Sequence, residues 1–337
     1  MKEKDSSPVE IIRRLNAAPP PGFVSGESLS RTLSISRTAV WKQIKGLKKM
    51  GFAIESVPSK GYRLEAKTGS ADPFNAVSLT AGLASETIGK KIFFYDSLDS
   101  TNTRAFELGR SGEPEGAVVI AETQTSGKGR LGRIWESPAG VNLYASIIIR
   151  PNLAPYEAQG ITLLAAVTAS EAIAAFVPSS PVVKWPNDVL IGSRKVAGIL
   201  TEMDTEPERI NFIVVGIGVN VNMTKNLLPD SLKAVATSLR DSAGGEVSRT
   251  EFALSLFYSF EKWYKIYLTE GLPPVLGAWK GLFASEGKPV RVTGLNDTIE
   301  GICMGVDSTG ALLVRRASGG VEKVLAGDVE MVRRKSL

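Results

Sequence analysis

Apolar residues recur every three or four positions in three short stretches near the start of the chain, over residues 8–16, 26–33 and 37–50. This period is that of an amphipathic α-helix with one buried face. Ser25 and Ser36 stand immediately before the second and third stretches, where a serine is favoured as the N-cap. The buried faces of the three predicted helices would carry these apolar side chains: Val9, Ile12, Leu15, Leu29, Leu33, Val40, Ile44 and Leu47.

Residues 52–64 alternate with a period of two around a turn at 58–61, which predicts a β-hairpin with a basic tip. Three helices followed by such a hairpin are the arrangement of a winged helix-turn-helix. The third helix would enter the major groove of DNA, and the hairpin tip would reach a flanking phosphate. The side chains expected to contact DNA are polar or basic: Ser36, Arg37, Thr38, Lys42 and Lys60.

Charge bears on this interpretation because it is unevenly spread along the chain. Residues 1–66 hold twelve lysines and arginines against six acidic residues, whereas the rest of the chain holds 28 against 29. Positive charge concentrated on one small domain is typical of nucleic-acid binding. A winged helix used for protein contacts or dimerisation stays open as an alternative, but the charge favours DNA.

Beyond a polar linker at 66–73, strand-like and helical stretches follow one another as in an α/β layer fold. Two long helices are expected at 155–176 and 249–268. The first carries almost only Ala, Leu, Val and Ile on one side, so it should lie across a sheet. The strand-like runs are 92–95, 117–122, 143–150, 182–185, 189–191, 196–203 and 210–221.

From residue 285 onward the pattern changes to short strands separated by Gly or Asp turns, which predicts a small SH3-like β-barrel. The expected strands are 288–295, 298–306, 312–316, 321–325 and 329–332. The fold class is therefore α/β and multidomain, with a mixed sheet in its centre. The expected domains are a winged helix-turn-helix at 1–66, a central α/β domain at 67–284 and an SH3-like domain at 285–337.

The amino-acid composition excludes several types of catalytic and metal site. The 337 residues include no histidine and one cysteine, Cys303. Ser-His-Asp and Cys-His catalysis, an internal disulfide and a cysteine-built zinc site are thereby excluded, and the sequence assigns no metal ligands. The first residues lack the apolar stretch of a secretory signal, and the apolar runs are too short or too polar for a bilayer. We expect a cytoplasmic protein without a membrane segment.

The candidate chemistry lies in a loop at 123–135 between two apolar runs. Glycine lets a backbone approach a ligand closely, and arginine suits planar carboxylate or phosphate groups. The order of residues does not fit a Walker A loop, and no clear helix follows, as a dinucleotide fingerprint requires. An ordinary basic surface loop remains an alternative for the loop taken alone. Three glycines alternate in it with three cations: Gly127, Lys128, Gly129, Arg130, Gly132 and Arg133.

Three further motifs stand in order around this loop: Asp99-Ser-Thr-Asn102, Lys184-Trp-Pro-Asn-Asp188 and Lys195-Val-Ala-Gly198-Ile-Leu. Together they resemble the biotin–protein ligases, whose pattern is Gly-Arg-Gly-Arg-x-Gly-Arg, Lys-Trp-Pro-Asn-Asp and Lys-x-x-Gly-Ile. The N-terminal phrases Phe-x-Ser-Gly-Glu-x-Leu, Ser-Arg-x-Ala-Val and Pro-x-Lys-Gly-Tyr are similar to those of the bifunctional ligase–repressors. That family has the same three domains in the same order.

The resemblance implies an activity and its partners. Biotin and ATP would be condensed to biotinoyl-5′-AMP and pyrophosphate, with Mg²⁺ accompanying ATP. Biotin would then pass to a lysine of a biotin carboxyl carrier domain. Biotinoyl-AMP would also act as corepressor, favouring a homodimer that binds a two-half-site operator and represses biotin genes.

The resemblance also implies roles for residues. Arg130 and Lys184 would be the catalytic cations, and the Gln124 amide would pair with the ureido ring of biotin. Where the family commonly has arginine, this chain has Lys128, which keeps the charge but lacks the bidentate fork. The implied contacts to biotin or the adenylate are Ser100, Thr101, Asn102, Gln124, Gly127, Lys128, Gly129, Arg130, Lys184, Gly198 and Asn220.

Simpler explanations coexist with some of these roles. Ser100 would also serve as the N-cap of a helix that begins there. The run Gly216-Ile-Gly218-Val-Asn220 matches a family motif beside the nucleotide, although strand packing alone would accept two glycines.

Two other functions remain as alternatives. A transcription regulator with an inactive ligase fold is opposed by the intact Arg130 and Lys184. A lipoate or octanoyl transferase shares the fold class, but the loop together with Lys-Trp-Pro-Asn favours biotin.

Overall fold

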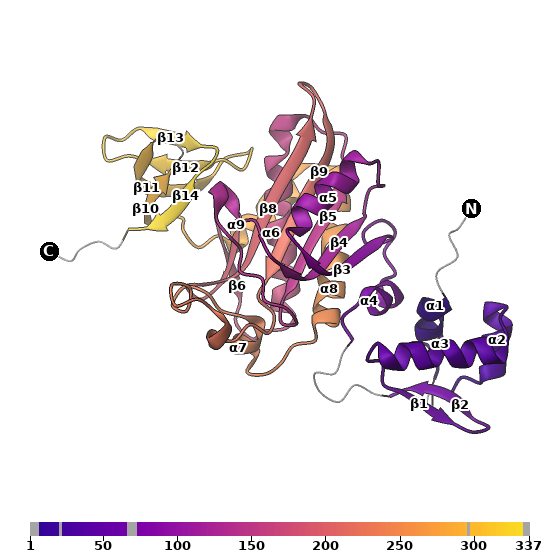
Figure 1. The fold of residues 1–337 in the computed structure, drawn as a ribbon. Helices are drawn as coiled ribbons and strands as arrows, with labels where there is room; N and C mark the ends of the chain where they lie inside the picture. Colours follow the sequence, from indigo (N-terminus) through magenta and orange to yellow (C-terminus); the bar gives the residue numbers. More distant parts are fainter. Residues whose placement is uncertain (1–6, 20–21, 66–72, 295–296, 333–337) are drawn as a thin grey trace.

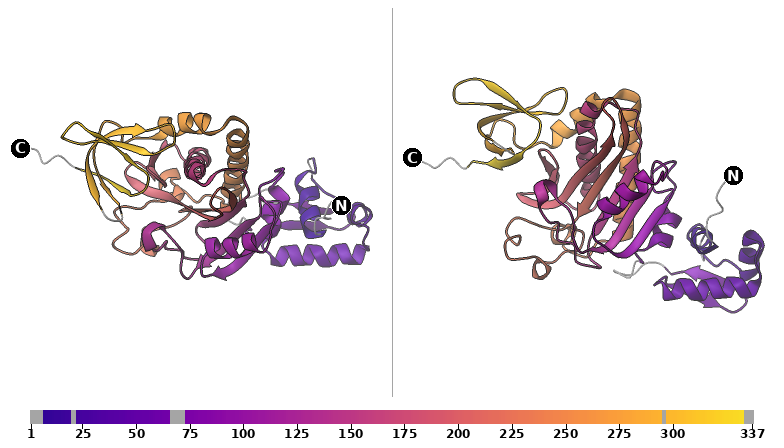
Figure 2. Two further views of the ribbon diagram at one scale, coloured as in Figure 1. Left: turned by 90° about the horizontal axis from the view of Figure 1, so that it is seen from above. Right: turned by 45° about the horizontal axis from the view of Figure 1, so that its top comes forward.

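The computed structural model describes residues 7–19, 22–65, 73–294 and 297–332. A helical domain with a small hairpin and a five-stranded domain lie on opposite sides of a larger domain built on a central sheet (Figure 1). Both views in Figure 2 keep this arrangement. The expected linker at 66–73 lies, except for Pro73, outside the described residues.

The N-terminal domain has the predicted three helices and hairpin. Ser25 Oγ accepts a hydrogen bond from Ser28 N at 3.0 Å, and Ser36 Oγ accepts one from Ala39 N at 3.1 Å, so both predicted N-caps are confirmed. Every apolar residue predicted to face inward is buried except Leu33, which is half-buried against the same core. The elements are α1 (Ser7–Asn16), α2 (Gly26–Leu33), α3 (Arg37–Lys49), β1 (Ile54–Val57) and β2 (Gly61–Leu64).

The central sheet has seven strands in the order β3-β4-β5-β9-β8-β7-β6. Strands β3 and β4 are parallel, and all other neighbours are antiparallel, so the sheet is mixed as expected. Each predicted strand is present. Their bounds are β3 (Ile92–Leu98), β4 (Val118–Gln124), β5 (Leu143–Ile149), β6 (Pro181–Lys184), β7 (Asp188–Ile191), β8 (Arg194–Thr205) and β9 (Ile210–Val219).

Helices cover both faces of this sheet. On one face lies α5 (Thr101–Arg110), whose Ala105 and Leu108 pack on strand residues such as Phe212. On the other face α6 (Gln159–Ala174) lies between the sheet and the helices α8 (Arg249–Glu270) and α9 (Leu272–Leu282) (Figure 2). Because α6 is enclosed on both sides, twelve of its 16 residues are buried and it has no continuous polar face.

The helix expected at 155–176 is shorter in the structure. Residues Pro155–Glu157 form a separate 3₁₀ turn, where the Glu157 carboxylate accepts a hydrogen bond from Ala154 N at 2.9 Å. The α-helix begins only at Gln159 and ends at Ala174. Three further helices were not predicted: α4 (Ala76–Gly82), α7 (Leu239–Ala243) and α9. None of the helices among the described residues combines the length and apolarity needed to cross a membrane.

Helix α4 contacts two domains. The Arg13 guanidinium of α1 donates a hydrogen bond to Thr80 O at 2.9 Å, and Val77 and Ala81 pack against the N-terminal core. On its other side, the Tyr258 hydroxyl of α8 donates to Gly82 O at 3.0 Å. Helix α4 therefore joins the winged domain to the sheet domain through direct contacts.

The C-terminal domain contains all five predicted strands, which pair antiparallel in the order β13-β12-β11-β10-β14 and curl around a small apolar core (Figure 2). It is tied to the sheet domain because Gly310 O accepts hydrogen bonds from Trp185 Nε1 at 3.1 Å and Gln159 Nε2 at 3.0 Å. The bounds are β10 (Pro289–Thr293), β11 (Thr298–Val306), β12 (Leu312–Arg315), β13 (Val321–Val324) and β14 (Asp328–Met331).

Candidate functional site

Two cavities adjoin beneath the glycine-rich loop of the central domain. The first is narrow, with a volume of about 50 Å³, and strands β8 and β9 form its floor. The second has a volume of about 410 Å³ and extends toward residues 223–236 and Asp328 of the C-terminal domain. Five residues line both cavities and therefore mark their junction: Gly129, Arg130, Trp135, Asn187 and Lys195.

Helix α5 begins at the wall of the first cavity. Gln124 Oε1 accepts hydrogen bonds from Thr101 N at 2.8 Å and Thr101 Oγ1 at 3.1 Å, while Gln124 Nε2 donates to Ser137 Oγ at 2.9 Å. Both ends of the Gln124 amide thus make hydrogen bonds within the protein, and these bonds position Thr101. Ser100 occupies the predicted N-cap position, but its side chain makes no capping hydrogen bond.

The next residue of this helix, Asn102, is held by three groups. Its Oδ1 accepts from Ser146 Oγ at 2.7 Å, and its Nδ2 donates to Leu200 O at 3.1 Å and to Glu202 Oε2 at 2.8 Å. A side chain on Gly216 would place its Cβ 2.0 Å from Asn102 Oδ1, which explains a glycine in this strand. The predicted residues Ser100, Thr101 and Asn102 therefore lie together with Gln124 around the first cavity.

The glycine-rich loop is a tight hairpin. Gly129 N donates to Arg133 O at 2.7 Å, and Trp135 N donates to Gly127 O at 2.8 Å. A Cβ on Gly127 would lie 2.4 Å from Trp135 O, so a side chain there would open the hairpin. Only a short 3₁₀ turn, Arg130–Gly132, follows the first half of the loop, as expected for a loop that is not a dinucleotide fingerprint.

The cations of the loop have different partners. Arg130 Nη1 lies 3.3 Å from both Asn187 Oδ1 and the carbonyl oxygen of Gly327, to which it donates. Burial lowers the pKa of the Arg130 guanidinium, although it remains charged because the ordinary value lies far above neutral pH. Lys128 Nζ lies 3.6 Å from Glu202 Oε1, and Arg133 forms an ion pair with Asp328.

Trp135 lies across the sheet under this loop. A Cβ on Gly218 would stand 2.7 Å from its ring, and one on Gly198 would stand 2.9 Å from it, so both glycines make room for the indole. The indole N–H is buried and has no hydrogen-bond partner among the described residues. A buried donor without an acceptor is uncommon in folded proteins, and a bound ligand would supply one.

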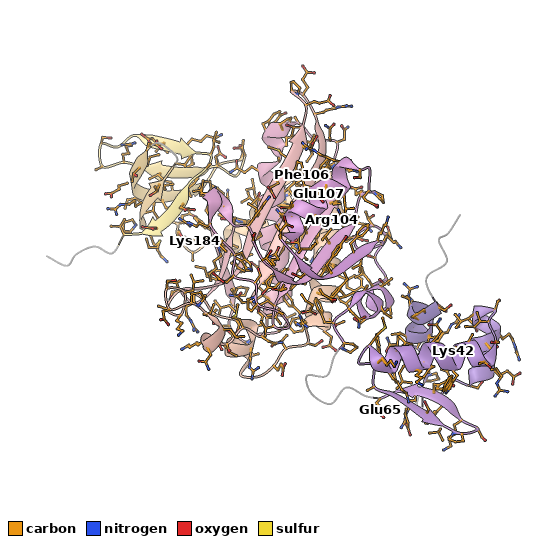
Figure 3. The ribbon with its side chains drawn as sticks, viewed as in Figure 1. Lys42, Glu65, Arg104, Phe106, Glu107 and Lys184 are labelled. Carbon is orange, nitrogen blue, oxygen red and sulfur yellow. The ribbon has the colours of Figure 1, made fainter. Side chains whose placement is uncertain are left out.

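The structure does not place all predicted residues in one cavity. Lys184, at the end of β6, lines only the second cavity, and Figure 3 shows it on the side that faces the C-terminal domain. Asn220 also lines only the second cavity, where its Nδ2 donates to Thr237 O at 3.0 Å. The Asn220 side chain therefore fastens the end of β9 to a neighbouring loop segment.

Three junction residues stand in the sequence motifs but were not assigned to the site there: Trp135, Asn187 and Lys195. Lys195 Nζ forms an ion pair with Asp188 Oδ1 at 2.6 Å and lies 5.2 Å from the centre of the Trp135 ring. The Lys-x-x-Gly-Ile motif could have pointed to Lys195, because this lysine lies near the start of β8, the strand that also carries Gly198. No group of three or more acidic or cysteine side chains within the described ranges is arranged to hold a metal ion.

The winged domain presents a separate groove between α3 and the β1–β2 hairpin. Arg37 and Lys60 line it, and so does Trp41, which is 52% exposed although it is large and apolar. Thr38 and Lys42 are exposed on α3, and Figure 3 marks Lys42 on this helix. Among the predicted DNA contacts, Ser36 differs, because its hydroxyl is engaged as the N-cap of α3. The helix start, the hairpin tip and the groove form one basic surface.

Comparison with known families matches all three parts of the chain. Residues 94–220 match the Biotin/lipoate A/B protein ligase family, residues 10–63 match an HTH domain, and residues 287–332 match the Biotin protein ligase C terminal domain. The first match includes the glycine-rich loop and most of the two cavities.

Similar whole proteins and structures agree with these matches. The bifunctional ligase/repressor BirA of Bacillus subtilis is 38% identical over 92% of this chain and 94% of its own length, and the Escherichia coli protein of that name is 32% identical over 92% and 93%. The biotin protein ligase of Aquifex aeolicus, solved with biotin and ATP, superposes with a TM-score of 0.62 at 28% identity, covering 72% of this chain and 99% of that one. This chain belongs to the family of bifunctional biotin–protein ligases and repressors.

Proposed function

We propose that this protein condenses biotin with ATP to biotinoyl-5′-AMP and pyrophosphate, and then transfers biotin to a lysine of a biotin carboxyl carrier domain. The observation that carries this proposal is the position of Arg130 at the junction of two adjoining cavities. A two-substrate condensation needs two neighbouring sites, and a fixed cation where they meet stabilises the charge that develops between them.

The lining of the first cavity suits the polar ring of biotin. It has a floor of strand backbone with glycines at Gly198, Gly216 and Gly218, and polar groups at one end, where α5 begins. Such a mixture of a mainly apolar slot and a few convergent polar groups is typical of small-molecule sites. Ser100, Thr101 and Asn102 would contact the polar ring, with Gln124 holding Thr101 in place.

The second cavity suits ATP. Cationic Lys184 and Arg130 lie on its wall, and apolar Met223, Leu228 and Leu232 line the part formed by the segment that follows β9. Cations suit the phosphates, and apolar side chains suit a nucleobase. The carboxylate of biotin would then meet the α-phosphate at the junction. Two anions repel each other there, so Arg130 and Lys184 would offset both this repulsion and the charge of the transition state.

Mg²⁺ would enter with the triphosphate. Mg²⁺ prefers oxygen ligands and is commonly held by one or two carboxylates together with substrate phosphates. Near the junction, Asp188 has one oxygen committed to Lys195, and the Asn187 amide oxygen accepts from Arg130. These residues therefore fit a magnesium ion held mainly by the nucleotide, with Asp188 as the carboxylate within reach.

We further propose the division into domains at 1–66, 67–284 and 285–337, and a cytoplasmic location where ATP, carrier protein and DNA are all present. The winged domain would bind an operator through α3 and the hairpin. Biotinoyl-AMP would act as corepressor by favouring a homodimer, because a ligand shifts an equilibrium only when it binds one form better.

One experiment tests the enzymatic part. Labelled biotin, ATP and a biotin carboxyl carrier fragment are incubated with the protein, and label on the carrier lysine is measured. Transfer that depends on ATP supports the proposal. Absence of both adenylate and transfer would indicate a regulator with an inactive ligase fold. Transfer of lipoate or octanoate in place of biotin would indicate the related acyltransferases.

A further inference from the structure

Trp41 is a large apolar side chain that stands exposed in the groove of the winged domain. It is 52% exposed and lines this groove together with Arg37, Lys45 and Lys48 of the same helix. Among the described residues of this domain, Met50 is the other large apolar side chain of similar exposure, but it forms the C-cap of α3 and does not line the groove. Tryptophan next to basic side chains is typical of a binding surface.

The core of the winged domain gives no reason for a tryptophan at this position. Val40 and Ile44 belong to the buried face of α3. Arg37, Trp41 and Lys45 are spaced four residues apart, so they form a separate row along the surface of the helix. The Lys45 ammonium group lies 5.3 Å from the centre of the Trp41 ring, and this cation–π contact orients the ring without burying it.

The surroundings of Trp41 are positively charged. In the part of the winged domain that the structure describes, neither Arg37 nor Lys45 forms an ion pair with an acidic side chain. Glu27 is the one acidic residue that lines the groove, and its carboxylate is paired with Arg31 at 3.2 Å. A basic groove with an apolar side chain inside it complements duplex DNA, because the phosphates are anionic and the grooves expose the edges of the bases.

Trp41 is the fifth residue of α3, within its first two turns. In a helix-turn-helix, the N-terminal residues of the recognition helix contact base edges in the major groove. The indole presents mainly carbon atoms, and thymine is the base that presents a methyl group in that groove. We propose that Trp41 is a specificity-determining residue that packs against the C5-methyl group of a thymine at one fixed position in each operator half-site. This inference rests on the operator binding proposed above.

Site selection supplies the DNA for the test. A library of duplexes with a random central segment is bound, with biotin and ATP present, to the unchanged full-length protein and to each variant, and the bound duplexes are sequenced. The unchanged protein should select a thymine at one fixed position in each half-site. Trp41→Ala should lose this preference alone, and Trp41→Phe should keep part of it because it retains an apolar ring. Met50→Ala is the matched control outside the groove and should select the same sites as the unchanged protein.

Removal of the methyl group tests the contact directly. The selected thymine is replaced by deoxyuridine, which pairs in the same way but lacks the C5-methyl group. For each half-site, the unchanged protein should bind the substituted duplex about fourfold more weakly, the usual effect of leaving one methyl-sized apolar group unburied. Trp41→Ala should bind both duplexes equally. Lys60→Ala should bind both duplexes more weakly but keep the fourfold difference, because a phosphate contact carries no sequence information.

Several results would overturn the inference. Deoxyuridine might cost the unchanged protein no affinity, or it might cost Trp41→Ala as much as the unchanged protein. A changed oligomeric state of Trp41→Ala with an unchanged DNA preference would assign Trp41 to protein contacts instead. If the unchanged protein selects no sequence at all, operator binding itself fails, and the inference fails with it.

The same samples show whether the substitution disturbs the fold. Thermal unfolding and biotinoyl-AMP formation of Trp41→Ala should match those of the unchanged protein, because the side chain is exposed and lies in a different domain from the two cavities. If Trp41→Ala does not fold, Trp41→Gln replaces it in both measurements and should likewise bind the thymine and deoxyuridine duplexes equally.

Discussion

Lys128 of the glycine-rich loop pairs with Glu202 of β8, with 3.6 Å between Nζ and Oε1. The other carboxylate oxygen of Glu202 accepts a hydrogen bond from Asn102 at 2.8 Å. One carboxylate therefore connects the loop to the start of α5, and both partners line the first cavity. The lysine that stands where the family commonly has arginine thus has a defined partner in this chain.

Glu202→Gln should weaken biotin binding modestly. The glutamine oxygen can still accept from Asn102, so the loss is mainly that of the ion pair with Lys128. Because the Lys128 and Glu202 side chains are 44% and 33% exposed, the pair is worth at most about 1 kcal/mol, or roughly fivefold in affinity. Calorimetric titration with biotin at low and high salt measures it, and the difference should shrink at high salt. A large loss that salt leaves unchanged would show that the link to Asn102 matters more.

Arg130→Ala and Lys184→Ala should each slow adenylate formation by about 10²-fold while the fold stays intact, because each removes a cation that offsets transition-state charge. Pyrophosphate release and thermal unfolding are measured on the same samples. Arg316→Ala is the matched control, since Arg316 lies on the C-terminal surface in an exposed pair with Glu322. Normal pyrophosphate release by either variant would contradict the assigned role of that residue.

Gly216→Ala should destabilise the protein and weaken biotin binding. The new Cβ would lie 2.0 Å from Asn102 Oδ1, and overpacking of this kind costs about 1–3 kcal/mol. Chemical denaturation and biotin titration measure the two effects. Gly277→Ala on α9 is the control, because an added Cβ there meets no atom within 4 Å, and it should be neutral or slightly stabilising. Equal stability of both alanine variants would be inconsistent with this packing.

The predictable features of this fold are those set by local patterns. The N-caps at Ser25 and Ser36 and the strands of the three described sheets follow from neighbouring residues. Helix α9 was not predicted, because its first residues include two prolines and its eleven residues carry no clear polar face. Helix α4 spans only seven residues, and its stability comes from contacts with two domains.

The arrangement of the site depends on contacts between residues far apart in the chain. Gln124 was expected to bind biotin directly, and it lines the first cavity while its amide also hydrogen-bonds Thr101 and Ser137, which the sequence did not show. The position of Lys195 depends on the pairing of β7 with β8, which is shifted by a bulge after Val189. Neither the partner of an amide nor the register across a bulge can be read from spacing alone.

The C-terminal domain should lose stability at low pH through Asp307. Burial alone would raise the pKa of this carboxyl group, but hydrogen bonds from Lys323, Thr309 and Ala311 outweigh it and lower the pKa to about 2. A lowered folded-state pKa contributes stability above the unfolded value of about 3.9, and this contribution is lost as pH falls toward 2. Unfolding of the full chain followed from pH 6 downward should show a smaller acid sensitivity in Asp307→Asn.

The control for this prediction is Asp230→Asn. Asp230 pairs with Lys233, three residues further on, and its side chain is 95% exposed, so its replacement should leave the acid sensitivity as in the unchanged protein. If Asp307→Asn and the unchanged protein lost stability in parallel between pH 4 and 2, the hydrogen bonds around Asp307 would not set the acid response.

We expect Lys60→Ala and Lys42→Ala each to weaken operator binding and to make the affinity less dependent on salt. Each lysine that neutralises one phosphate releases about one counterion, so its loss should reduce the slope of log affinity against log salt by about one. Lys90 is an exposed lysine of the central domain, so Lys90→Ala should leave the slope unchanged.

Gel-shift titrations at several salt concentrations, with and without biotin and ATP, measure both the slope and the corepressor effect. In the mechanism proposed above, the corepressor acts through the population of the dimer, so biotin with ATP should raise the affinity of every variant by the same factor while the slopes stay different. If biotin and ATP do not change the DNA affinity, the corepressor role is contradicted, while the proposed ligase activity is unaffected.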